Sequence, residues 1–150
     1  MVLGKDKDDK VISIYTNLLP GGNLGDLNSF PFIKHFGDEG VAKGDAGAEK
    51  VVISKIDDNV KSLDFVINNY TAEAENASPK KFKELGLKIN FKDNVEESEI
   101  NFDNNEIGDA ALICRIENEI AGAKLTKMDT IIKDYNELST IYPQLKIWSK

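Results

Sequence analysis

Acidic side chains gather in a glycine-rich stretch, residues 37–49, whose sequence is GDEGVAKGDAGAE. Asp38, Asp45 and Glu49 supply carboxylates there, and the glycines let the backbone curl so that carbonyl oxygens can face one point. Ca²⁺ takes roughly six to eight such oxygens in flexible geometry. Carboxylates held together repel one another unless a cation lies between them. We therefore predict that these three residues bind Ca²⁺; the alternative is a solvated acidic loop, and the spacing is not that of an EF-hand.

A second group of acids, Asp6, Asp8 and Asp9, precedes the first apolar segment. Lysines alternate with these aspartates, so the alternative interpretation is a frayed, solvated terminus. Asp57 and Asp58 form a further pair, of a kind that is common in ordinary turns.

Other kinds of reactive site find little support. One cysteine and one histidine are too few for a zinc site with several thiolates. No nucleophile motif or phosphate-binding loop is present. We interpret His35 as a structural histidine, Cys114 as a small hydrophobe within an apolar run, and Trp148 as a packing anchor. The sequence thus predicts a binding protein rather than an enzyme, although clustered carboxylates leave a hydrolase as a weaker alternative.

The size and charge of the chain restrict its partners. Its 150 residues suit a single domain, residues 1–150, and its net charge of −7 disfavours nucleic acids and anionic lipid surfaces. The start, MVLGKDKDDK, lacks an apolar leader, and no run reaches the length of a membrane span. We expect a cytoplasmic protein with protein partners and no membrane insertion.

Short apolar segments rich in β-branched and aromatic residues punctuate the chain, as is typical of strands. Residues 65–67 are apolar on consecutive positions, which predicts a central strand covered on both faces. Residues 93–94 (Asp-Asn) are a hairpin signal between two alternating segments. The predicted strands cover residues 11–15, 30–36, 51–56, 63–70, 87–91, 100–102, 110–116 and 120–128.

The final apolar residues recur at helical spacing. Asp129 is a suitable N-cap and Pro143 a suitable end, which predicts an amphipathic helix over about residues 129–142. Strands and helices do not alternate, so a doubly wound sheet is disfavoured. The expected fold is mainly β: a two-sheet antiparallel β-sandwich with a C-terminal amphipathic helix.

Several segments together resemble the TerD family of tellurium-resistance and stress-response proteins. The resemblance covers roughly residues 35–128 and rests on the order of several short motifs. They are the acidic glycine-rich loop with its strand (44–53), a spacer and buried strand (57–67), a hairpin (87–91 and 99–102), and a further pair of strands (109–116 and 123–125).

The resemblance implies a β-sandwich that binds Ca²⁺ through acidic loops. Asp38 and Asp45 occupy the positions of the family's loop acids, and Glu49 that of the acid before the strand. Asp6 and Asp8 stand in for the acidic motif that the family carries near its N-terminus. The loop holds fewer acids than is usual in the family.

Two main functions follow. The first is a calcium-binding stress-response module of the tellurite-resistance type that acts by binding. The second is a metal-free structural or assembly β-sandwich that uses its C-terminal helix and Trp148.

Overall fold

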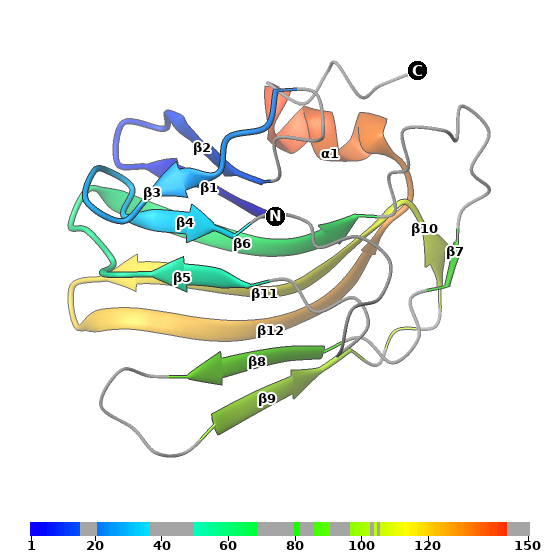
Figure 1. The fold of residues 1–150 in the computed structure, drawn as a ribbon. Coiled ribbons are helices and arrows are strands. Elements are labelled where there is room, and N and C mark those ends of the chain that lie inside the picture. Colours follow the sequence, from blue (N-terminus) through cyan, green and yellow to red (C-terminus); the bar gives the residue numbers. More distant parts are fainter. Residues whose placement is uncertain are drawn as a thin grey trace.

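A computed structural model describes most of the chain (Figure 1). The described residues are 1–15, 21–36, 50–68, 80–81, 86–90, 97–102, 104 and 106–143. The predicted hairpin turn at residues 93–94 and Trp148 lie outside them.

The largest element is a five-stranded antiparallel sheet in the order β12-β11-β6-β1-β2. The strand predicted to be central, β6, lies in the middle of this sheet, between β11 and β1, as its consecutive apolar residues indicated. The strands are β1 (Val2–Asp6), β2 (Val11–Ile14), β6 (Val60–Asn68), β11 (Ala110–Glu119) and β12 (Gly122–Ile132).

Smaller antiparallel sheets complete the described strands. The predicted pairing of the segments around residues 87–91 and 100–102 is confirmed by the β8–β9 pair. A mainly β, antiparallel fold is therefore correct. The remaining strands are β3 (Gly25–Asp26), β4 (Ile33–His35) and β5 (Val51–Ile53) in one sheet, β8 (Gly86–Asn90) and β9 (Glu97–Asn101) in another, and β7 (Lys80–Lys81) with β10 (Ile107–Gly108).

Apolar side chains bury both faces of the five-stranded sheet. On one face Leu63 packs in a cluster with Ile33 of β4, and Val51 and Ile53 of β5 contact the same cluster. In Figure 1, β4 and β5 accordingly lie over the large sheet. On the other face Val66 joins a cluster that contains Tyr142, from the segment after the helix. Alternation along β6 thus sends neighbouring side chains into separate cores.

The C-terminal helix differs from the prediction. Its described extent is α1 (Tyr135–Ile141), whereas Ile131 and Ile132 belong to β12 and are buried there. Asp129 is not an N-cap: it lies inside β12 at a φ of 49°, next to an irregularity in the β11–β12 register. These residues form a strand rather than a helix because pairing with β11 places both isoleucines in core clusters, and this burial outweighs their helical spacing.

Asp134 caps α1 instead. Its Oδ1 accepts a hydrogen bond from the backbone N–H of Glu137 at 2.9 Å, and the carboxylate of Glu137 accepts one from the Lys133 N–H at 3.2 Å. The first bond is that of an N-cap side chain to the third helical residue, and the second ties Glu137 to the residue before the cap, so both hold the start of the helix in place. Among the residues that the structure describes, no helix is long and apolar enough to cross a membrane.

Candidate functional site

The predicted metal ligands fall into two groups. Asp38, Asp45 and Glu49 lie outside the described residues. Asp6 and Asp8 are described: Asp6 ends β1, and Asp8 is exposed in the turn that leads to β2.

This turn meets a second acidic connection at one end of the sheet. The pairing of β1 with β6 places the β1–β2 turn beside loop 54–59, which joins β5 to β6, and the N–H of Lys7 donates to the carbonyl of Asn59 at 2.9 Å. Both connections lie at the left of Figure 1. We call residues 6–9 together with residues 57–59 the acidic end. It joins two aspartate clusters that are about fifty positions apart in the sequence.

The carboxylates of the β1–β2 turn already have several partners. Asp6 Oδ1 accepts hydrogen bonds from the N–H groups of Asp8, at 2.8 Å, and Lys10, at 2.9 Å, so this side chain shapes the turn. Asp9 Oδ1 lies 2.7 Å from Nζ of Lys61, whose hydrogen bond and charge lower the pKa of Asp9. Residues 6–9 therefore form a hydrogen-bonded turn rather than the frayed terminus of the alternative interpretation.

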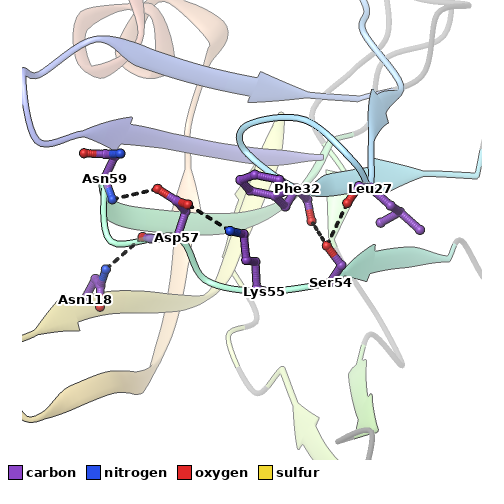
Figure 2. Close-up of polar contacts among 7 residues, drawn as sticks. All are labelled: Leu27, Phe32, Ser54, Lys55, Asp57, Asn59 and Asn118. Carbon is purple, nitrogen blue, oxygen red and sulfur yellow. Dashed lines mark hydrogen bonds and ion pairs between the residues drawn. The ribbon is translucent and has the colours of Figure 1, made fainter.

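Loop 54–59 is held by a similar set of contacts, which Figure 2 shows. Asp57 accepts a hydrogen bond from the Asn59 N–H at 3.0 Å and lies 3.3 Å from Nζ of Lys55; both contacts lower its pKa, the backbone bond most. Asn118 of β11 donates from Nδ2 to the carbonyls of Asp57 and Val60, at 3.1 and 2.9 Å. The loop is thereby tied to the C-terminal end of β11.

The other predicted ligands, the acids of stretch 37–49, belong to a connection that begins and ends at another place in the fold. The residues that flank stretch 37–49, Phe36 and Lys50, are joined by a hydrogen bond of 3.0 Å from the Phe36 N–H to the Lys50 carbonyl. This bond lies at the start of β5, and loop 54–59 leaves from the opposite end of that strand (Figure 1). The chain thus enters and leaves the predicted calcium loop at the far end of β5 from Asp6 and Asp57.

In the described ranges, no group of three or more histidine, cysteine, aspartate or glutamate side chains is arranged to hold a metal ion. The carboxylates of Asp8 and Asp58 make no hydrogen bond or ion pair within that part of the chain. They are the acids of the acidic end that remain available to a cation.

A buried polar network, which the sequence analysis missed, lies on the opposite face of the sheet from β4 and β5. Asp64 of β6 is 3% exposed. Its Oδ1 accepts a hydrogen bond from Nε of Arg115 at 2.6 Å, and its Oδ2 accepts bonds from Nη2 of Arg115 at 3.0 Å and from the hydroxyl of Tyr142 at 2.6 Å. This bidentate pair with a third donor satisfies a carboxylate that would otherwise be strongly disfavoured in the interior.

The network also perturbs the pKa values of its neighbours. Hydrogen bonding to Asp64 raises the pKa of Arg115. Burial, aided by the bond to Asp64, raises the pKa of the Tyr142 hydroxyl well above its usual range. Burial and then the charge of Asp64 raise the pKa of Cys114 to about 12. The predicted role of Cys114 as a buried hydrophobe is confirmed, and His35 is likewise buried in β4.

A sequence signal for this network did exist. Asp64 interrupts the apolar run Leu63-Asp64-Phe65-Val66-Ile67, and an aspartate inside a two-sided strand requires a partner. Arg115, the only arginine of the chain, interrupts a second such run. The register pairs Arg115 with Asp64 across adjacent strands. Arginine, aspartate and tyrosine held in this way fasten the C-terminal segment to the sheet.

Comparison with known proteins adds no assignment. No family model, curated protein or solved structure matches the chain.

Proposed function

We propose that the protein is a calcium-binding stress-response module of TerD-like β-sandwich architecture, acting in the cytoplasm by binding partners rather than by catalysis. The observation that supports this proposal most is the meeting of two acidic turns at one end of the sheet, where Lys7 donates to Asn59. The available carboxylates of Asp8 and Asp58 belong to these turns. The sequence adds three further acids, Asp38, Asp45 and Glu49, in a glycine-rich connection between β4 and β5.

Calcium in such connections would stabilise the folded chain. A cation bound by carboxylates from separate connections offsets their repulsion and exists only in the folded state. A ligand present at a hundredfold excess over its dissociation constant adds about 2.7 kcal/mol to the free energy of unfolding. The expected signature is a melting temperature that rises with Ca²⁺ concentration.

The test measures melting temperature in EGTA and in millimolar Ca²⁺. We expect a rise in the wild type, and this rise disappears in Asp38→Ala/Asp45→Ala if the ion lies in stretch 37–49. Glu106→Ala/Glu119→Ala removes the same charge from exposed positions in and beside the strands and should keep the rise. The absence of any heat of binding in calorimetry at millimolar Ca²⁺ would reject the proposal.

A parallel comparison separates the two acidic regions. Asp8→Ala/Asp58→Ala leaves the hydrogen bonds of the β1–β2 turn and of loop 54–59 in place, because neither side chain contributes to them. If calcium binds at the acidic end, this variant loses the calcium-dependent rise while its melting temperature in EGTA stays near that of the wild type. An unchanged rise would place the ion away from the acidic end.

The second candidate is a metal-free interaction or assembly module. It is favoured by large apolar side chains that remain exposed, such as Phe36 at 48% and Ile120 at the β11–β12 turn. This candidate expects concentration-dependent oligomers in EGTA. A sedimentation series that gives only monomer would count against it.

A further inference from the structure

The outer side of β4 carries alternating rings and cations. Ile33 and His35 point inward, with 0% and 1% of their surfaces exposed, so the alternation of a strand places Lys34 on the opposite side. The Phe36 ring, just after the strand, lies beside Lys34, and Phe32, just before the strand, carries a second ring. The antiparallel register sets Lys50 opposite Phe36. Lys55, just after β5, adds another cation at the other end. These five residues, Phe32, Lys34, Phe36, Lys50 and Lys55, are the basic–aromatic face.

The lysines stack on the rings. Nζ of Lys34 and Nζ of Lys50 each lie 5.2 Å from the centroid of the Phe36 ring. Nζ of Lys55 lies 4.0 Å from the centroid of the Phe32 ring, and Figure 2 shows the two side chains together. Cation–π contact holds the ammonium groups in place at the surface, and those of Lys34 and Lys50 keep their N–H donors for an anion.

Three cations gather on this face of a chain whose net charge is −7. Within the described residues only Lys55 has a carboxylate partner, the exposed Asp57 at 3.3 Å. Lys34 and Lys50 both approach a single ring and have no acidic partner in that part of the chain. Their mutual repulsion is relieved when a partner brings carboxylates to this face.

We propose that the basic–aromatic face binds an extended acidic segment of a partner protein. Lys34 and Lys50 occupy diagonal positions on neighbouring strands, about 7 Å apart at their Cα atoms. Alternate residues of an extended peptide are also about 7 Å apart. Acids at every second position therefore match the lysines along the face. The phosphate backbone of a nucleic acid is disfavoured by the net negative charge of the whole molecule.

This inference goes beyond calcium binding and does not require it. The test titrates the full chain, in EGTA, into a fluorescein-labelled peptide of alternating glutamate and threonine and follows fluorescence anisotropy. We expect saturable binding that weakens with added salt. Lys34→Ala/Lys50→Ala should lower the affinity on the order of tenfold, and Phe36→Ala roughly threefold.

The matched control is Lys124→Ala/Lys133→Ala, which removes two exposed lysines from the end of the chain that carries β12 and α1. It should bind the peptide like the wild type, and an equal loss would mean that net charge alone governs binding. All variants change exposed or half-exposed side chains, and circular dichroism checks that each is folded.

Three further results would overturn the proposal. A peptide of the same composition with contiguous glutamates would bind equally well if the alternating match were wrong. Single-stranded oligothymidine would bind more tightly than the peptide if the face served nucleic acids. Sedimentation would show self-association that Lys34→Ala/Lys50→Ala abolishes if a second copy were the occupant. Peptide binding that persists in EGTA while calcium has no effect on melting would reject only the calcium function.

Discussion

At the scale of single residues, three hydrogen bonds constrain the carboxylate of Asp64. It is buried, and it is satisfied by the guanidinium of Arg115 and the hydroxyl of Tyr142. Loss of one donor leaves a charged acceptor without its partner in the interior. This lowers the free energy of unfolding more than replacing both partners by apolar side chains would. The contribution of each donor can therefore be measured as a change in the free energy of unfolding.

Tyr142→Phe should lower the free energy of unfolding by about 1–3 kcal/mol, because Oδ2 of Asp64 loses a donor while the ring still packs. Urea denaturation measures the effect. Thr140→Val is the control, since its hydroxyl bonds to the Asn136 carbonyl at an exposed position and should change stability by less than about 0.5 kcal/mol. Equal changes in the two variants would contradict the role given to Tyr142.

At the scale of elements, the boundary between β12 and α1 decides how the C-terminal segment is built. The strand continues through an irregularity at Asp129, where Nδ2 of Asn104 donates to the Asp129 carbonyl at 3.1 Å. The helix starts only after Asp134. Asp129 and Asp134 are both suitable N-cap residues. The pairing of β12 with β11 keeps Asp129 in the strand, so Asp134 caps the helix.

The two aspartates should respond differently to mutation. Asp134→Ala removes the acceptor of the Glu137 N–H and should destabilise the protein by about 0.5–2 kcal/mol. Lys133→Ala, next to it and exposed, should have an effect within about 0.5 kcal/mol. Denaturation of both variants is the measurement. Equal losses would mean that the capping bond contributes nothing.

Asp129→Gly should change the free energy of unfolding by less than about 1 kcal/mol, because glycine adopts the positive φ of 49° without the strain of a side chain, and this gain opposes the loss of the interactions that Asp129 makes. Thermal melting compares the variant with the wild type. A large destabilisation would show that the Asp129 side chain matters more than its backbone.

At the scale of the whole molecule, charge is distributed unevenly. The acidic end gathers aspartates at the β1–β2 and β5–β6 connections, whereas the basic–aromatic face displays one lysine in β4 and two that flank β5. Lys55 and Asp57 stand where the two regions meet. Separate surfaces of opposite charge suit a binding module that takes a cation at one place and an acidic partner at another.

Alkaline pH should destabilise the fold. The pKa of Cys114 is raised from 9.0 to about 12, so the folded state keeps its proton where the unfolded state loses it. The associated stability is fully present below pH 9 and is lost as the pH rises toward about 12. Cys114→Ala should show a shallower decline over this range, by an amount on the order of a few kcal/mol at its upper end.

Urea denaturation at a series of pH values gives both slopes. The raised pKa of Tyr142 acts in the same direction and is unchanged in the cysteine variant, so the difference between the slopes reports on Cys114 alone. Parallel declines in the wild type and in Cys114→Ala would show that the buried thiol does not contribute.

The sequence by itself determined the class of the fold and its central strand. Residues 65–67 are apolar on consecutive positions, which predicted a central strand, and the alternation around residues 87–91 and 100–102 predicted a hairpin. These signals are local, because each strand carries its own pattern of burial. The acids of the candidate calcium site were also visible as residue types, although Asp38, Asp45 and Glu49 lie outside the described residues.

Only the tertiary structure decided which of these residues meet. The register of β1, β6 and β11 joins Asp6 to the loop of Asp57, and it places Arg115 on Asp64. It also converted a helical pattern at Ile131 and Ile132 into strand, because pairing with β11 buries both side chains. The contacts of Asp6 and Asp64 join residues about fifty positions apart, those of Ile131 and Ile132 join residues about twenty apart, and no local pattern encodes the partner across the sheet.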